Sequence, residues 1–268
     1  MCSVKRNHVS DRGIAYLDVG SGHAVLLIHA FGFDATMWEP QIEFLTARGY
    51  RVLAHDHRGF GDSPSPAPDH TFQHSIADAL SVLDHAGVAS AVAAGVSMGS
   101  ATSVGLAIGH PERMRGLVLA DNSRPDGPER GAAAAKRIHA LGLAGLADVY
   151  EPILFSDRFR RSNPDFISAW RGRLTALDPE DLATIVEPYH GRPDPGPALE
   201  SIRVPTAIVY GSDDAAIAEH RRADYTAIHS ATLFVIDGAG HMSSLENPTR
   251  FNEILLHLVE HAYPNGSV

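Results

Sequence analysis

Short apolar runs alternate with longer amphipathic segments over most of the chain. Residues 24–28 (AVLLI) are apolar throughout, which is typical of a strand buried on both faces of a parallel sheet. Residues 71–86 instead place Ile76, Leu80 and Leu83 on one side of a helix. This alternation predicts an α/β fold with a mostly parallel sheet flanked by helices. Further strands are expected at 50–54, 90–94, 116–120, 206–210 and 232–236. Further helices are expected at 40–48, 98–108 and 248–261, and one from the end of strand 206–210 to residue 228. Residues 3–10 and 13–19 are expected to form an antiparallel pair at one edge of the sheet.

Residues 122–203 interrupt the alternation with segments of helical character. We expect helices at 128–141, 143–155, 164–174 and 179–189, followed by an extended connector at 191–197. A structureless loop of this length is improbable in a compact domain. Because the segment follows a strand end, we expect a helical lid over the carboxyl edge of the sheet, where ligands bind in open α/β sheets. The sheet core then comprises residues 1–121 and 204–268.

The composition is that of a globular protein and argues against several classes of function. The 268 residues are 44% hydrophobic and carry a formal net charge of −10, without the basic stripe typical of nucleic-acid binders. The single cysteine, Cys2, excludes an intrachain disulfide and a thiolate zinc site, and no other cluster has metal-ligand spacing. No apolar run is long enough to span a membrane, and residues 1–10 lack the apolar stretch of a secretory signal. We therefore expect a cytoplasmic protein without nucleic-acid, membrane or metal partners.

The sequence Gly95-Val96-Ser97-Met98-Gly99 matches G-x-S-x-G between an expected strand and an expected helix. In this context a tight turn exposes the serine hydroxyl, and small flanking residues keep side chains out of the turn. The helix that begins there directs backbone N–H groups at developing negative charge. We interpret Ser97 as a nucleophile, with a chance glycine–serine turn as the alternative.

A serine nucleophile needs a base that is held in place by a third group. Asp214 and His241 both lie just beyond expected strands, and the chain order serine, aspartate, histidine is that of this type of triad. His241 stands out among 16 histidines by its glycine-flanked loop. The alternatives to Asp214 are Asp213, which could cap a helix, and Asp121, which ends the strand at 116–120.

Two loops that follow early strands have different expected roles. The loop His29-Ala30-Phe31-Gly32 can supply one backbone N–H group of an oxyanion hole, and the residue after the nucleophile supplies the other. Phe31 and Met98 are therefore the expected donors, and His29 is expected to shape the loop. Residues 56–63 (DHRGFGDS) are rich in glycine but lack the lysine of a phosphate-binding loop, so they predict a structural turn.

Together these motifs resemble the α/β-hydrolase family over almost the whole chain. Within that family the chain is most similar to the 3-oxoadipate enol-lactonases, a group of carboxylic ester and lactone hydrolases, in residues 31–38, 97–99, 143–159 and 240–248. The resemblance implies a serine hydrolase of small esters or lactones that forms an acyl-enzyme and requires no cofactor. Ala30 and Ser100 stand where the family usually has glycine, and residues 187–197 depart from the family near the end of the lid.

The residues that contact the substrate are less clearly marked than the triad. Trp38 and Trp170 could line an apolar pocket or pack in the core. Ser100 could touch the pocket because it follows the nucleophile motif. A substrate carboxylate would pair with an arginine. The candidates are Arg124, which we include among the expected binding residues, and Arg137, Arg160, Arg161, Arg171 and Arg173.

Other functions are compatible with the same motifs. A C–C bond hydrolase of aromatic ring-cleavage products and a cofactor-free perhydrolase use the same triad. A ligand-binding protein on a hydrolase scaffold is an alternative of another class. A nucleotide-binding oxidoreductase would need a G-x-G-x-x-G after an early strand, which is missing. We expect a monomer or homodimer that acts on a small molecule.

Overall fold

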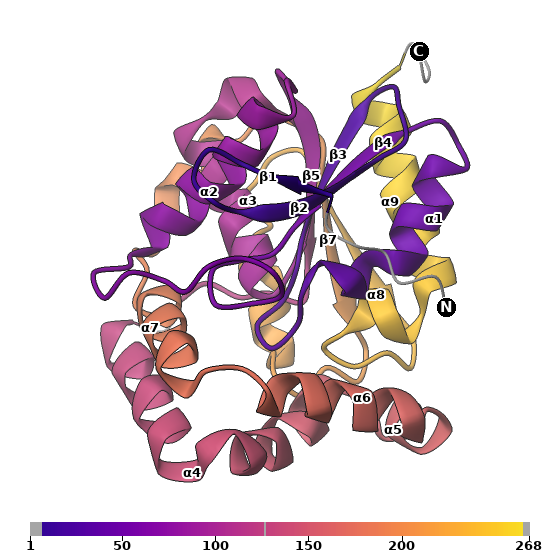
Figure 1. Ribbon diagram of the computed structural model, residues 1–268. Helices are drawn as coiled ribbons and strands as arrows, with labels where there is room; N and C mark the ends of the chain where they lie inside the picture. Colours follow the sequence, from indigo (N-terminus) through magenta and orange to yellow (C-terminus); the bar gives the residue numbers. More distant parts are fainter. Residues whose placement is uncertain (1–6, 126, 265–268) are drawn as a thin grey trace.

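Eight strands form one sheet in the computed structural model, which describes residues 7–125 and 127–264 (Figure 1). Their spatial order is β1-β2-β4-β3-β5-β6-β7-β8. The pairs β1–β2 and β2–β4 are antiparallel, and every other pairing is parallel, so the expected α/β class and its antiparallel edge are confirmed. Residues 3–6 of the first expected strand lie outside the described residues. The strands are β1 (His8–Val9), β2 (Ala15–Val19), β3 (Ala24–Ile28), β4 (Arg51–His55), β5 (Ala91–Val96), β6 (Met114–Ala120), β7 (Thr206–Gly211) and β8 (Ala231–Ile236).

Both faces of the sheet are covered by helices, which explains why the central strands are apolar at every position. In β3, Val25 and Leu27 belong to the apolar cluster beneath α1 (Glu39–Thr46) and α9 (Pro248–Ala262). Leu26 and Ile28, which point the other way, belong to the cluster beneath α2 (Phe72–His85) and α3 (Met98–Gly109). Figure 1 shows these two helix pairs on opposite sides of the sheet.

A helical segment between β6 and β7 lies across one end of the sheet (Figure 1). It consists of α4 (Pro128–Leu154), α5 (Asp157–Ser162), α6 (Pro164–Thr175) and α7 (Pro179–His190). Gly142 interrupts α4 with φ 63° and ψ 173°, at the point where the sequence predicts two separate helices. The apolar residues Ile138, Trp170 and Leu182 of this segment belong to the same cluster as Val25 and Leu27 of the sheet.

The close packing of α4 against α7 depends on one glycine. A Cβ atom on Gly131 would lie 2.2 Å from the carbonyl oxygen of Glu187, whereas ordinary contact begins at about 3.4 Å. Helix propensity alone disfavours glycine at this position. The glycine therefore sets the distance between the two helices.

The connection between β7 and β8 differs from the expectation of a helix that continues to residue 228. It contains the 3₁₀ turn η4 (Glu219–Ala223) and otherwise irregular backbone. The Asp214 carboxylate accepts hydrogen bonds from the N–H groups of Ala216 and Ile217, the pattern of a helix N-cap, but no α-helix follows. The remaining short elements are η1 (Ala35–Trp38), η2 (Pro111–Arg113), η3 (Gly196–Ser201) and α8 (Ser243–Glu246). Within the described ranges, no helix has the length and apolar character needed to cross a membrane.

Candidate active site

The turn from β5 into α3 holds Ser97 in a conformation that few non-glycine residues adopt. Its φ of 53° and ψ of −111° are strained for an L-amino acid. A Cβ atom on Gly95 would lie 2.2 Å from the carbonyl carbon of Gly99, and one on Gly99 would lie 2.0 Å from the carbonyl oxygen of Ile28. Both glycines of the motif are therefore required by close backbone contacts. The N–H group of Ser97 donates to the carbonyl of Ala120 over 2.8 Å, which ties the turn to the end of β6.

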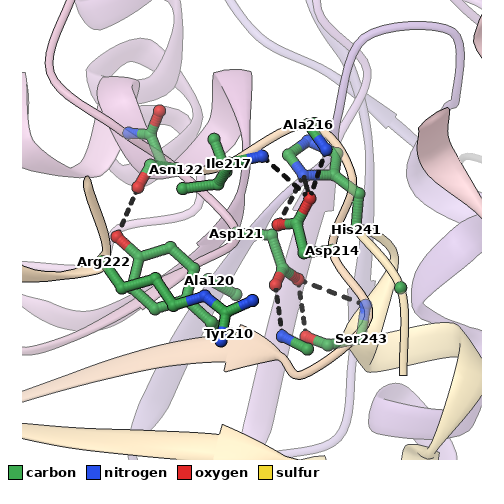
Figure 2. A network of polar contacts seen from close by, with 12 residues as sticks. Ala120, Asp121, Asn122, Tyr210, Asp214, Ala216, Ile217, Arg222, His241 and Ser243 are labelled. Carbon is green, nitrogen blue, oxygen red and sulfur yellow. Dashed lines mark hydrogen bonds and ion pairs between the residues drawn. The ribbon is translucent and has the colours of Figure 1, made fainter. Parts of the chain in front are cut away.

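His241 is paired with Asp214 (Figure 2). Its Nδ1 atom lies 2.9 Å from Oδ2 and 3.1 Å from Oδ1 of Asp214. The backbone N–H groups of Ala216 and Ile217 donate to Oδ1 over 2.8 and 3.1 Å. Asp214 is thus fixed by its own loop and orients the imidazole so that its Nε2 atom is available to another group.

The protonation of His241 is set by two opposing effects. Burial lowers the pKa of His241, since the imidazolium is poorly solvated there. The charge of Asp214 and its hydrogen bond outweigh burial, so the pKa of His241 lies above its usual value. A histidine of this kind can accept a proton near neutral pH and is stabilised once it carries the proton.

Asp121 and Asp213, the two rivals of Asp214, bind other groups. Asp121 accepts hydrogen bonds from the N–H of Gly211 over 3.1 Å and from the hydroxyl of Ser243 over 2.5 Å (Figure 2). Burial, followed by the nearby Asp214 charge, raises the pKa of Asp121 well above that of an ordinary carboxyl. Asp213 is exposed and accepts from the hydroxyl of Ser212. Asp121 therefore connects the Asp214 loop to the His241 loop without contacting the imidazole.

A cavity of about 520 Å³ lies between the carboxyl ends of the strands and the helical segment. Ser97 and His241 both line it, as does Phe31. Met98 is the first residue of α3, so its N–H group has no partner within the helix. In the described parts of the chain, no protein acceptor takes the N–H of Phe31 or Met98. This cavity can therefore bring a carbonyl group to a serine hydroxyl, an imidazole and two backbone donors.

The fold agrees with what is found in known proteins. A model of the alpha/beta hydrolase family matches residues 25–254, which is most of the chain. The chain belongs to this family. The hydrolase is 28% identical over 232 residues to 3-oxoadipate enol-lactonase 2 of Acinetobacter baylyi, with 85% of each chain covered. Its structure is similar to that of a thermophilic esterase from Thermogutta terrifontis with malate bound, with a TM-score of 0.86 and 29% identity over 97% of this chain and 98% of the esterase. It is also similar to the enol-lactonase from Burkholderia xenovorans LB400, with a TM-score of 0.85 and 26% identity over 93% of this chain and 97% of the enol-lactonase.

Three of the residues expected to bind substrate in this hydrolase do not line the cavity. Trp38 is fully buried and packs against Phe251, with ring centroids 6.0 Å apart. Trp170 is fully buried and packs edge-on against Phe155. The hydroxyl of Ser100 lies 2.7 Å from the Gly95 carbonyl and 2.8 Å from the Ala120 carbonyl.

These contacts explain the placement. Both tryptophans are buried in the apolar cluster that the sheet shares with the helical segment, so their rings have no surface left for a ligand. Ser100 stabilises the Ser97 turn, because its hydroxyl donates to carbonyl groups near the ends of both β5 and β6. Arg124 does line the cavity, but its guanidinium is paired with Asp194 over 2.7 Å.

The two early loops of the hydrolase hold the Phe31 segment in place. His29 lies with Nδ1 2.8 Å from the Ala30 carbonyl, and its Nε2 accepts the N–H of His57 over 2.8 Å. Asp56 accepts the N–H groups of Ala35 and Asp62 over 2.8 and 2.9 Å. Residues 56–63 therefore act as a structural turn beneath the cavity, as their composition indicates.

Sequence reasoning missed a link between the helical segment and the histidine loop. Glu246 accepts hydrogen bonds from the N–H of Gly240 over 3.0 Å and from the N–H and hydroxyl of Ser156 over 3.0 and 2.5 Å. The N–H of Met242 also donates to the Leu154 carbonyl. The only sequence signal for this link is the short distance in the chain between Glu246 and His241. In the described part of the hydrolase, no three metal-binding side chains are grouped as a metal ion would require.

Proposed function

We propose that this α/β hydrolase cleaves a small carboxylic ester or lactone by a serine mechanism with an acyl-enzyme intermediate. The observation that carries the proposal is the Asp214–His241 pair, which opens into the same cavity as the strained Ser97 turn. A hydroxyl group is a weak nucleophile, and an adjacent imidazole held by a carboxylate is the usual means of activating it.

In the proposed reaction His241 Nε2 accepts the proton of Ser97 while Oγ attacks the carbonyl carbon. Asp214 keeps the proton on Nδ1 and stabilises the imidazolium that forms. The tetrahedral intermediate then expels the alcohol, which takes the proton from His241, and in a lactone the ring opens at this bond. A water molecule deprotonated by His241 attacks the acyl-enzyme and releases the acid.

Negative charge on the carbonyl oxygen is stabilised by the N–H groups of Phe31 and Met98. Neither donor is occupied by a protein acceptor in the described residues, so both are available to the intermediate. Loss of one such donor costs about 3 kcal/mol in the transition state.

Relatives support the choice of substrate group. The 3-oxoadipate enol-lactonases and the esterase named above act on carboxylic esters or lactones according to their names, which makes 3-oxoadipate enol-lactone a natural first substrate. We also propose that residues 122–203 act as the lid of this site, because helices of this segment form one wall of the cavity.

The proposal is tested by measuring hydrolysis of 3-oxoadipate enol-lactone and of p-nitrophenyl acetate by the wild type, Ser97→Ala and Ser168→Ala. Ser168 is an exposed serine on α6 outside the cavity lining and serves as the control. We expect turnover of at least one substrate that Ser97→Ala abolishes and Ser168→Ala retains, with an unchanged circular dichroism spectrum.

The outcomes separate the proposal from its alternatives. Activity on the acetate alone keeps the serine mechanism and rejects the lactone. Cleavage of a vinylogous diketone in place of either ester indicates a C–C bond hydrolase, and peroxide-dependent halogenation indicates a perhydrolase. Tight binding of the lactone without multiple turnovers would refute the enzyme and favour a ligand-binding protein.

A further inference from the structure

The end of β6 lies between the strands that lead to Ser97 and to Asp214. In the sheet, β6 pairs with β5 on one side and with β7 on the other. The carbonyl of Ala120, the last residue of β6, accepts the N–H of Ser97 over 2.8 Å. The next residue, Asp121, donates its own N–H to the carbonyl of Val209 in β7 over 2.9 Å. Two successive residues therefore tie the end of β6 to both of its neighbours.

The side chain of Asp121 extends these contacts to the loop of His241 (Figure 2). Its Oδ1 atom accepts the N–H of Gly211, three residues before Asp214, over 3.1 Å. Its Oδ2 atom accepts the N–H and the hydroxyl of Ser243, two residues after His241, over 3.2 and 2.5 Å. One carboxylate thus bonds to both of the loops that hold the Asp214–His241 pair.

Asp121 occupies this position at a cost in free energy. Within the described residues, Asp121 with φ 50° and Ser97 with φ 53° are the two non-glycine residues in the positive-φ region. Such strain persists only where the surrounding structure holds it. Asp121 is also fully buried, and in the same described ranges no arginine or lysine forms an ion pair with it. A buried carboxylate without a cationic partner is unfavourable for stability, which argues for a role other than stabilising the fold.

The charges of Asp121 and His241 stabilise each other. Three carboxylates raise the pKa of His241 against the effect of burial: Asp214 in the loop after β7, Asp121 after β6, and Glu246 in α8. Burial and the Asp214 charge raise the pKa of Asp121 to about 8, and the imidazolium charge of His241 lowers it. Because this coupling is mutual, the ionised form of Asp121 is most favoured when His241 carries a proton.

We propose that Asp121 is a positioning residue of the hydrolase, which joins the Asp214 loop to the His241 loop and whose negative charge stabilises the imidazolium formed when His241 takes the proton of Ser97. Its hydrogen bonds go to Gly211 and Ser243, so it acts on the imidazole through the two loops and through its charge. This inference rests on the proposed function and adds a second carboxylate to the Asp214–His241 pair.

The kinetic test uses Asp121→Asn with p-nitrophenyl acetate as the substrate. Asparagine tolerates a positive φ and has the same size, but it lacks the charge and places an N–H₂ group next to a backbone donor. We expect kcat to fall about 10- to 100-fold and KM to change less than about twofold, because the charge acts after the proton has moved. The pH midpoint of kcat/KM should move down, since a negative charge that raises the pKa of His241 is removed.

Asp18→Asn is the matched control. Asp18 is a half-buried carboxylate of β2 that pairs with Arg51 over 2.6 Å and lies outside the cavity lining. We expect this variant to be less stable in urea unfolding but to keep the kcat and the pH midpoint of the wild type. Equal losses of kcat in the two variants would overturn the proposal. An unchanged midpoint in Asp121→Asn would also overturn it, because a purely structural role does not act on the proton affinity of His241.

Ser243→Ala tests the same link while Asp121 stays in place, and it carries the test if Asp121→Asn does not fold. The Ser243 hydroxyl favours the ionised form of Asp121. Its loss should therefore lower kcat and move the midpoint in the same direction as Asp121→Asn, but by less. The double variant should be no slower than Asp121→Asn, since the hydroxyl has then already lost its partner. A double variant in which the two single losses multiply would refute the link.

A covalent probe keeps the inference separate from the choice of substrate. Phenylmethylsulfonyl fluoride reacts with an activated serine: Oγ bonds to sulfur, fluoride leaves, and the hydroxyl proton passes to the base. Labelling of Ser97 is followed by mass spectrometry over a range of pH. We expect Asp121→Asn to be labelled about tenfold more slowly than the wild type, with a lower midpoint, and Asp18→Asn to match the wild type.

The two experiments together distinguish the failures. A wild type that shows neither labelling of Ser97 nor ester turnover refutes the proposed function. Labelling of Ser97 with the same rate and midpoint in the wild type and Asp121→Asn refutes the role of Asp121 and leaves the proposed function standing.

Discussion

Two glycines in the helices between β6 and β7 should respond in opposite ways to the same substitution. Gly131 lies in α4 and Gly172 in α6, and helix propensity predicts that alanine stabilises either position by about 0.5–1 kcal/mol. A Cβ atom on Gly172 would meet nothing within 4 Å, so Gly172→Ala should show this gain. At Gly131 the Cβ atom would lie 2.2 Å from the Glu187 carbonyl oxygen, and α4 and α7 would have to separate by about 1 Å.

The net effect at Gly131 follows from the two terms. Overpacking of this kind costs about 3 kcal/mol, and the helix-propensity gain offsets about 1 kcal/mol of it, which leaves about 2 kcal/mol of destabilisation. For a chain of this size that lowers the Tm by about 4–8 °C, whereas Gly172→Ala should raise it by about 1–4 °C.

Differential scanning calorimetry of the wild type and both variants measures these shifts. Because residues of α4 on both sides of Gly131 line the cavity, Gly131→Ala should raise KM for an ester substrate more than it lowers kcat. A Gly131→Ala variant that is as stable as Gly172→Ala would refute the reasoning, since it would mean that the α4–α7 contact is not close enough to exclude a methyl group.

Three further predictions concern the loops of the candidate site. The value of kcat/KM should rise with pH through the pKa of His241, because only the neutral imidazole accepts a proton, and a midpoint of the initial-rate profile below about 6.5 would contradict the raised pKa. Asp214→Asn should lower kcat by about 10⁴-fold and move this midpoint down, while the exposed Asp213→Asn leaves both unchanged in the same assay. Glu246→Gln should destabilise the protein by about 1–3 kcal/mol in urea unfolding and lower kcat, because Glu246 bonds to both Gly240 and Ser156. Glu253→Gln on the surface is the control, and equal stability of the two variants would argue against a stabilising role of the Glu246 bonds.

Most of the sheet and its main helices are predictable from the sequence, because their signals are local. The strand β3 is apolar at every position since both of its faces are covered, and α2 shows one apolar stripe since it covers one face. The break in α4 is also predictable, because Gly142 is the residue type that tolerates a positive φ. The segment between β7 and β8 was predicted wrongly, since Asp214 there makes the backbone hydrogen bonds of a helix N-cap without an α-helix following it.

The candidate site likewise contains some residues that the sequence marks and others that it does not. Ser97 and His241 are marked by glycines that the backbone requires, and each follows a strand that ends at the same edge of the sheet. The choice of Asp214 over Asp121 depends on where two buried carboxylates point, and no pattern of neighbouring residues records that direction. The positions of Trp38 and Trp170 depend on how elements distant in the chain pack together, so residue type alone misleads for both.

The apolar cluster that joins the helical segment to the sheet has a consequence for how the protein unfolds and diverges. Ile138, Trp170 and Leu182 share one continuous interior with Val25 and Leu27, so these helices have no separate core that could persist once the sheet is lost. Amide protons in both regions should therefore exchange through the same global opening. Transplanting the helices onto a related sheet would also leave poorly packed apolar side chains where the helices meet the sheet. New specificity in this architecture is more readily gained by changing single side chains of the cavity wall than by exchanging the whole segment.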